Sequence, residues 1–206
     1  MQDYLSVPLP SPKLAIVDVP IVSLDFETTG LNPRQDNILS IGHVNLQHWQ
    51  IDVASASHYI IKQDKDLNSD NVIVHHITDQ QMQDGISAKQ ALATLLNVLA
   101  GKVLLVHFAT IELRFLKQAC IHYFGFAPIF ATIDTMLIAK RRFDMRDISY
   151  DPSQLRLMNL RARYQLPKHH AHNALSDALA TAELFMAQVC DSPQNKDTPL
   201  SHFLRY

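Results

Sequence analysis

The sequence has few cysteines, few glycines and almost no net charge. Its 206 residues include two cysteines and five glycines, and the formal net charge is −2. Cys120 and Cys190 each lie in an apolar helical pattern and lack metal-ligand spacing. Two thiols also do not make the disulfide framework of a small secreted protein. We therefore expect two buried thiols in a reducing compartment.

Long apolar runs and targeting segments are also missing. No stretch approaches the length that crosses a membrane. The first residues, MQDYLSVPLPSPKL, lack the basic and apolar regions of a signal peptide. The apolar content of 47% and the charged content of 18% are typical of a soluble globular protein. We expect a cytoplasmic protein with one domain large enough to bury a core.

The near-zero net charge argues against a protein that grips long nucleic acid unaided, because nonspecific affinity comes from neutralised phosphates. The charge is nevertheless uneven. Between residues 140 and 172, eight basic side chains, including Arg161 and Arg163, stand against three acidic ones. A solvated helical face explains this stretch as well as a local grip on phosphate does, so both interpretations stay open.

Composition divides the chain into three parts. Residues 1–19 are an N-terminal extension, and its first 13 residues, which hold three prolines and no periodicity, are expected on the surface. Residues 20–190 are the folded domain. Residues 191–206 are a polar tail with two prolines, expected to be loose unless its HFLRY sequence docks.

The pattern of elements predicts an α/β fold. Strands are expected at 14–26, 38–47 and 51–62, and their short turn-rich links suit an antiparallel meander. Thr78 and Gln81 are spaced as a helix capping box. Ser87 begins a helix with one leucine stripe. Further strands are predicted at 102–107 and 129–135, and further helices at 111–124, 135–142, 153–164 and 174–189. This order favours a mixed central sheet flanked by helices.

Two acids end the first strand, in the sequence IVSLDFETTGL. Asp25 and Glu27 are two residues apart, so their carboxylates project from the same face of the strand. Like charges this close repel, and one would be protonated unless a cation lies between them. A hard divalent cation with oxygen ligands is the simplest remedy.

Two more clusters place a carboxylate near a strand end or a helix start. Glu112 follows the strand that ends at His107, and Asp177 lies early in an apolar helix that His172 precedes. Each of these residues has an ordinary explanation on its own. Glu112 can be an acid that stabilises a helix start, Asp177 a solvated residue at the edge of an apolar face, and His172 a structural histidine. Together, four carboxylates and a histidine are the inventory of a two-metal phosphodiester site. The histidine can take a proton from water, because its pKa lies near working pH.

The stretches LDFETTGL, VHFATIELRFL and HNALSDA resemble, in order and spacing, the three motifs of the DEDDh (DnaQ-like) 3′–5′ exonucleases. That family includes the epsilon proofreading subunit of bacterial replicative polymerase and ribonuclease T. ILSIGHVNL, HHIT and IDTMLIAKR match lesser features of the family, and the resemblance spans residues 20–190. It implies a ribonuclease H-like fold and two Mg²⁺ or Mn²⁺ ions. It also implies stepwise release of nucleoside 5′-monophosphates from a 3′ end.

The resemblance also assigns roles to residues. Asp25, Glu27 and Asp177 become metal ligands, and Glu112 takes the position of the fourth carboxylate. The family histidine lies five residues before the last acid, so His172 becomes the general base in preference to its histidine neighbours at 169 and 170. The residues expected to hold or line the nucleotide are Thr28, His75, His107 and Phe108.

The chain departs from the family pattern at three positions. The family has aspartate where this chain has Glu112, asparagine where it has Phe108, and glycine where it has His76. Magnesium demands near-ideal geometry, so the longer Glu112 side chain is expected to bind the second metal weakly or through a water.

The sequence is compatible with three candidate functions. The first is a metal-dependent 3′–5′ exonuclease acting on single-stranded ends or short oligonucleotides, with DNA and RNA both open as substrates. The alternative is a nucleic-acid-binding protein with an attenuated site. The third is proofreading in complex with a polymerase, for which the sequence offers no recognisable polymerase-binding peptide.

Overall fold

The protein is described by a computed structural model that covers residues 4, 6–63, 77–191 and 195–205. Within these residues a five-stranded sheet has the order β3-β2-β1-β4-β5. The strands are β1 (Ile21–Thr28), β2 (Ile38–Gln47), β3 (Gln50–Ile60), β4 (Val103–Val106) and β5 (Thr132–Asp134). The first three strands pair antiparallel, and β4 and β5 continue the sheet in parallel with β1. The predicted mixed sheet and its antiparallel meander are confirmed.

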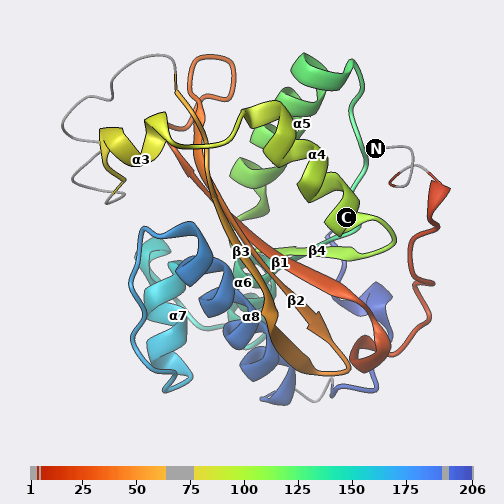
Figure 1. Ribbon diagram of the computed structural model, residues 1–206. Helices are drawn as coiled ribbons and strands as arrows, with labels where there is room; N and C mark the ends of the chain where they lie inside the picture. Colours follow the sequence, from red (N-terminus) through yellow and green to blue (C-terminus); the bar gives the residue numbers. More distant parts are fainter. Residues whose placement is uncertain (1–3, 5, 64–76, 192–194, 206) are drawn as a thin grey trace.

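Helices cover both faces of this sheet (Figure 1). They are α3 (Asp79–Gln83), α4 (Ala88–Leu99), α5 (Ala109–Phe124), α6 (Thr135–Met145), α7 (Leu157–Arg163) and α8 (Ala174–Cys190). Short 3-10 helices span Ile16–Asp18, Pro152–Leu155 and Leu200–His202. Figure 1 shows α4 and α5 on one side of the sheet and α6, α7 and α8 on the other. The capping box of Thr78 and Gln81 and the cap of α4 by Ser87 are confirmed.

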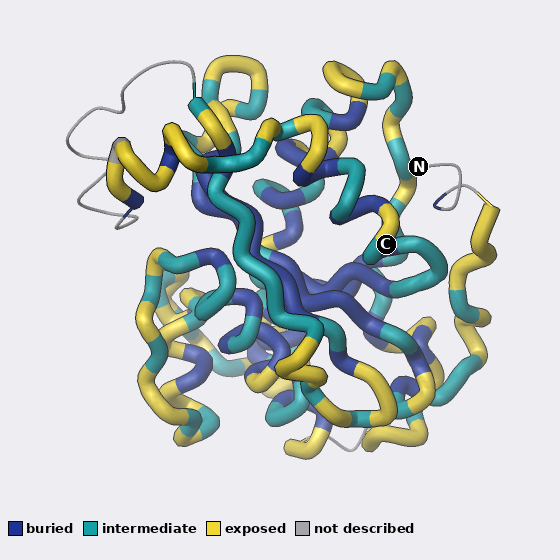
Figure 2. Tube along the Cα trace, in the orientation of Figure 1, coloured by how far each residue is buried: buried dark blue, intermediate teal, exposed yellow. Residues whose placement is uncertain are grey.

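The alternation of β1 divides the core into two sides. Val22, Leu24 and Phe26 pack with the buried leucines of α4 and with α5. Ile21 packs on the opposite face with residues of α8, and on that same face the Ser23 hydroxyl donates to the Ala178 carbonyl at 2.7 Å. The odd-numbered residues of β1 therefore face α8. In Figure 2 most of β1 is buried, whereas β3 at the edge of the sheet is intermediate or exposed.

The N-terminal flank differs from its prediction. The strand expected from residue 14 begins only at Ile21, because residues 16–18 form a 3-10 helix and Pro20 has no N–H to donate to a ladder. The first 13 residues are also not confined to the surface, because Tyr4 is buried.

The HFLRY sequence of the tail docks on the folded domain, which was one of the two possibilities left open by the sequence. Phe203 is buried against the α8 side of the core, and Leu204 bridges to Ile133 of β5. The expectation of two buried thiols is wrong for Cys190, which is exposed at the end of α8, whereas Cys120 is buried. The boundaries at residues 19 and 191 stay a prediction.

The basic stretch is only partly a solvated face. Arg161 is 3% exposed and cannot contact phosphate, so a phosphate-binding role for this residue is wrong. Arg142 bonds to the Tyr164 hydroxyl and to the Gln188 carbonyl, and the Arg163 guanidinium stacks over the Phe143 ring. Arg142, Arg161 and Arg163 therefore make contacts within the fold.

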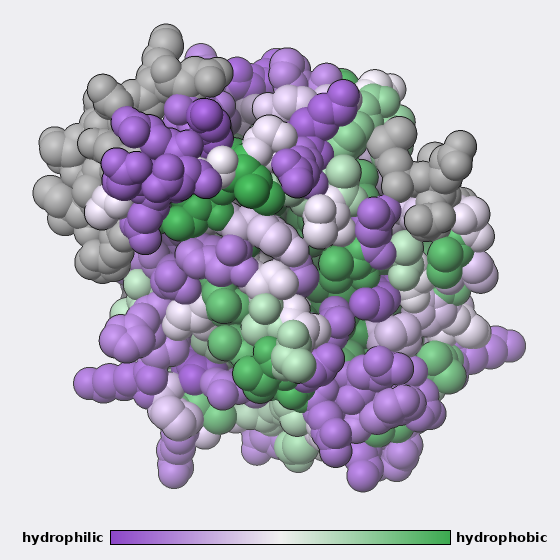
Figure 3. Space-filling view, in the orientation of Figure 1, coloured by the Kyte–Doolittle hydropathy of each residue, from purple (hydrophilic) through white to green (hydrophobic). Residues whose placement is uncertain are grey.

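The surface in Figure 3 is mainly hydrophilic, and its apolar side chains lie in small separate patches. Among the described residues, no helix has both the length and the apolar character needed to cross a membrane.

Candidate active site

Three carboxylates from two distant parts of the chain meet at the end of β1. Asp25 and Glu27 project from β1 toward α8, and Asp177 lies in the first turn of α8. One oxygen from each lies within 4.8 Å of the others. Ligand atoms at such separations suit a hard cation with oxygen ligands.

Local contacts bring the start of α8 to the sheet. Asn173 caps the helix by accepting from the Ser176 N–H at 3.0 Å. Gly42 of β2 is paired with Asp25, and a Cβ placed on it would lie 2.1 Å from the carbonyl carbon of Ala174. Only a residue without a side chain permits this approach, and the approach places Asp177 beside the two acids of β1.

The fourth carboxylate lies nearby but outside this group of three. Glu112 is buried in the first turn of α5, and its Oε2 atom has no hydrogen-bond partner among the described residues. Its charge is one of those that raise the pKa of Asp25, so it lies within electrostatic reach. Whether it completes a metal site stays a prediction.

The electrostatics of the site are dominated by several carboxylates that lie close together. Burial raises the pKa of Asp25 well above its usual value, and the charges of Glu112, Asp177 and Glu27 add to this. Burial also raises the pKa of Glu112 to about 8, with Asp134 adding to the shift. Divalent cations would relieve this repulsion, so the carboxylates fit Mg²⁺ or Mn²⁺.

The start of α5 is fixed by a residue that the sequence analysis did not assign to the site. Asp134, at the end of β5, accepts from the N–H groups of Phe108 and Ala109 at 3.1 and 3.0 Å. It also accepts from Met136 and Leu137 at 3.0 and 3.3 Å, and so caps α6 as well. The sequence did carry a signal for this role, because Asp134 directly precedes a predicted helix and aspartate is a favoured helix N-cap.

The residues expected to contact the nucleotide differ in their surroundings. The Thr28 hydroxyl donates to the Gly30 carbonyl at 2.7 Å. Phe108 is 40% exposed at the start of α5 in the left-handed conformation, with φ of 70°. His75 lies outside the described residues. All of these roles stay predictions.

His107 is held within the fold. Its Nδ1 atom lies 2.8 Å from the Thr135 hydroxyl oxygen, and its Nε2 atom lies 3.0 Å from the Leu155 carbonyl oxygen. Burial lowers its pKa to about 4, so the ring is neutral at pH 7. Any contact with a nucleotide would have to use the ring face or edge carbons.

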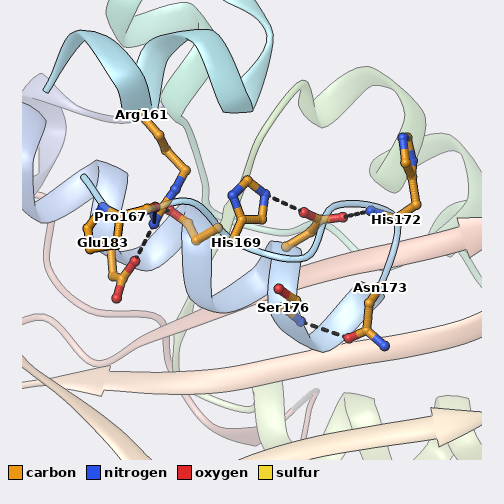
Figure 4. Close-up of polar contacts among 9 residues, drawn as sticks. Arg161, Pro167, His169, His172, Asn173, Ser176 and Glu183 are labelled. Carbon is orange, nitrogen blue, oxygen red and sulfur yellow. Dashed lines mark hydrogen bonds and ion pairs between the residues drawn. The ribbon is translucent and has the colours of Figure 1, made fainter. Parts of the chain in front are cut away.

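The histidines before α8 are arranged in a way that spacing did not indicate. The Nε2 atom of His169 lies 2.8 Å from Oδ1 of Asp177, whereas His172 donates its backbone N–H to Oδ2 of Asp177 at 2.9 Å. Figure 4 shows the His172 ring pointing away from that contact. His172 also has a positive φ of 64°. A pocket of about 580 Å³ is lined by His169, His170, Ala171, Asn173 and Ser176.

A family model described as Exonuclease matches residues 22–185. The chain belongs to the exonuclease family. The PolC-type DNA polymerase III of Thermotoga petrophila is 33% identical over 165 residues, covering 80% of this chain and 11% of that protein. The epsilon subunit of DNA polymerase III of Treponema pallidum is 27% identical over 192 residues, covering 89% of this chain and 83% of that one. This chain thus spans about a tenth of the length of the PolC-type relative.

The fold of an exonuclease structure agrees with these matches. E. coli exonuclease I in complex with a 5cy-dT13 oligonucleotide aligns with a TM-score of 0.73 at 14% identity, covering 86% of this chain and 42% of that chain. The resemblance to DnaQ-like exonucleases and the expected ribonuclease H-like fold are confirmed. The roles of the individual site residues are a separate question, which the family match leaves as predictions.

Proposed function

We propose that this exonuclease-family chain is a cytoplasmic, metal-dependent 3′–5′ exonuclease. It hydrolyses the terminal phosphodiester bond of single-stranded DNA or RNA, or of short oligonucleotides, and releases nucleoside 5′-monophosphates. The observation that carries the proposal is the meeting of Asp25, Glu27 and Asp177 within 4.8 Å, in a chain of this family. The polymerase names of the relatives describe those proteins, and for this chain nucleic acid alone is the proposed partner.

The carboxylates would hold two Mg²⁺ or Mn²⁺ ions. Asp25, Glu27 and Asp177 supply the first oxygen ligands, and Glu112 supplies the fourth carboxylate. Bound divalent cations activate water and stabilise the leaving oxygen in phosphodiester hydrolysis. The protein's own part is to hold these oxygens at the end of β1 and to position the scissile phosphate there.

The remaining roles concern proton transfer and nucleotide binding. His172 accepts the proton of the attacking water, after its ring turns toward Asp177 from the outward position in Figure 4. His169 leaves the Asp177 carboxylate when the cations bind. Thr28, His75, His107 and Phe108 border the terminal nucleotide.

The alternative is a nucleic-acid-binding protein with an attenuated site. The position of Glu112 outside the group of three carboxylates is the observation in its favour. Both functions predict oligonucleotide binding, but only an exonuclease shortens its ligand.

The test is hydrolysis of 5′-labelled single-stranded DNA, RNA and dinucleotides by the purified chain, with Mg²⁺ or Mn²⁺ and with EDTA. We expect a ladder that shortens from the 3′ end, needs the metal and disappears in Asp25→Asn. Binding without shortening would favour the attenuated site. Release from the 5′ end would contradict the proposed polarity.

A further inference from the structure

Arg161 is a buried cation that ties together three parts of the chain. It lies in the last turn of α7, and its Nη1 group donates to the Ala180 carbonyl of α8 at 2.7 Å. Its Nη2 group donates to the Pro167 carbonyl at 2.8 Å and pairs with the Glu183 carboxylate at 2.7 Å. Figure 4 shows Arg161 with Pro167 and Glu183, and His169 and His172, in one view.

A buried guanidinium in this position needs an explanation. Burying a charge is costly, and a hydrophobic side chain of similar volume would often serve stability as well or better. The planar fork of arginine, however, can hold two carbonyls in fixed directions at once, which lysine cannot do. The pattern of contacts therefore indicates fixation of geometry at Pro167 and Ala180.

The Pro167 carbonyl is the point where the histidine segment, residues 168–172, begins. At its other end, Asn173 caps α8. The segment is therefore fixed at both ends, and its five residues carry three histidines. One of them, His169, reaches Asp177 in this structure. Without the Pro167 contact, the free span would extend back to Leu166, whose N–H donates to the Arg161 backbone carbonyl at 3.0 Å.

We propose that Arg161 is a positioning residue for the histidine segment. By holding the Pro167 carbonyl to α8, it confines the segment so that an imidazole is presented to the carboxylate of Asp177. This role rests on the proposed exonuclease function for its catalytic consequence. It applies to whichever histidine acts as the base, because Arg161 fixes the segment and not one side chain.

The consequence is a specific kinetic defect. Substrate and cations would be held by groups on β1, α5 and α8, and Arg161 touches none of the carboxylates among them. Loosening the segment should therefore lower the fraction of molecules with a base in position and leave ground-state binding intact. Misplacement of a catalytic group by about 1 Å can cost up to about 10²-fold in rate.

The experiment compares Arg161→Lys with Glu183→Gln. The lysine variant keeps the charge but cannot make the forked contact. The glutamine variant removes the half-exposed charge partner and leaves both carbonyl contacts in place. Three quantities are measured: kcat and KM on a labelled oligonucleotide, the Mn²⁺-induced rise in melting temperature, and amide hydrogen exchange of residues 168–172 without metal.

For Arg161→Lys we expect about a tenfold fall in kcat, with KM and the Mn²⁺-induced rise in melting temperature close to wild type. Exchange in the histidine segment should become faster, while exchange in β1 stays unchanged. Glu183→Gln should match wild type in all three quantities. If the lysine variant melts below the assay temperature, Arg161→Gln replaces it, because it keeps a donor without a buried charge.

Two results would overturn the inference. One is wild-type exchange in residues 168–172 of Arg161→Lys. The other is a fall in kcat together with a rise in KM and a smaller Mn²⁺-induced rise in melting temperature, which would mean that Arg161 supports the whole site. Failure of the proposed function is a different result, namely wild type without hydrolysis. The exchange measurement needs no activity and still decides whether Arg161 fixes the segment.

Discussion

At the scale of single residues, the site gathers several carboxylates whose charges repel one another. Asp25 lies in a strand whose other residues are almost all buried, and its pKa is raised by burial and then by three neighbouring carboxylates. Such an arrangement costs stability in the free protein and is relieved when cations bind. Removing one charge should therefore affect stability and metal binding in opposite directions.

Asp25→Asn tests this opposition. Without metal, the variant should be more stable by about 1 kcal/mol, or about 2–4 °C in melting temperature for a chain of this length. With Mg²⁺ or Mn²⁺ its melting temperature should rise less than that of wild type, because less metal binds the folded state. Hydrolysis should be abolished. Equal metal-induced shifts in the two proteins would refute Asp25 as a ligand.

The histidine assignment is tested by His172→Ala. Turnover should fall by roughly 10²–10⁴-fold, the usual contribution of a general base. The metal-induced rise in melting temperature should survive, because no carboxylate is removed. His169→Ala and His170→Ala are the controls. His169→Ala is the more informative of the two, because His169 contacts Asp177 in the structure. A larger loss in His169→Ala would show that the motif spacing selects the wrong residue.

The sequence identified the carboxylates but not the contacts of the histidines. Residues two positions apart on one strand face the same way, so the pairing of Asp25 and Glu27 follows from local geometry. The histidine segment is neither helix nor strand, so no periodicity predicts where its side chains point, and the His172 ring points away from Asp177 in Figure 4. Spacing from Asp177 therefore gave a role for His172 but could not give its orientation.

At the scale of elements, the site depends on how closely α8 approaches β2. The sequence predicted both elements from their periodicity, and it predicted the caps of α3 and α4 from local residue types. It could not show that α8 crosses the sheet at Gly42, because that contact joins residues more than a hundred positions apart. For the same reason, the sequence allowed the HFLRY tail to dock but could not show which residues it would contact.

Gly42→Ala should separate these two elements. The added Cβ would lie 2.1 Å from backbone atoms of Ala174 and Leu175, so the start of α8 must move. We expect a loss of about 3 kcal/mol in the free energy of unfolding, at the upper end for overpacking. The metal-induced rise in melting temperature should also shrink, because Asp177 moves with α8. Both are measured by thermal melting with and without Mn²⁺.

The matched control is Ser40→Ala on the same strand. The Ser40 hydroxyl is buried and has no hydrogen-bond partner among the described residues, so its removal should leave stability nearly unchanged. A Gly42→Ala protein with wild-type melting behaviour and metal response would mean that α8 adjusts without moving Asp177.

At the scale of the whole molecule, the two flanks of the domain pack together and against the sheet. Ala15 bridges to Pro199, and Leu200 donates its N–H to the Leu14 carbonyl at 2.8 Å. Beyond them, the Arg205 guanidinium reaches Thr110 of α5 at 3.1 Å. The tail thus contacts the helix that carries Glu112, although more than 90 residues separate the two in sequence.

Phe203→Ala measures the contribution of the tail. The Phe203 ring is buried and meets the Phe185 ring edge-on, with ring centres 5.8 Å apart. Truncation should cost about 3 kcal/mol in the free energy of unfolding, at the lower end for a buried phenylalanine. Lys196→Ala, at an exposed position of the same tail, should change stability by less than about 0.5 kcal/mol. Denaturant unfolding of both variants gives the comparison, and equal midpoints would mean that the tail does not stabilise the fold.

The acid stability of the whole fold should depend on His43. This ring is buried beside Tyr59, and neither of its nitrogens has a hydrogen-bond partner among the described residues. Burial, with the charge of Lys102 adding to it, lowers its pKa to about 4. Between that value and the ordinary pKa of about 6.5, the unfolded chain binds a proton that the folded chain does not, so stability falls as the pH falls.

His43→Phe should remove this part of the acid sensitivity. One pKa unit corresponds to about 1.4 kcal/mol, and the unfolded histidine is half protonated at pH 6.5, so between pH 6.5 and pH 5 wild type should lose about 1.6 kcal/mol more than the variant. Between pH 9 and pH 8 the two stability curves should run parallel, because an imidazole is neutral in both states there. The measurement is urea unfolding across this range in EDTA, which keeps the carboxylate site free of metal. Parallel curves down to pH 5 would show that His43 takes up its proton equally well in the folded protein.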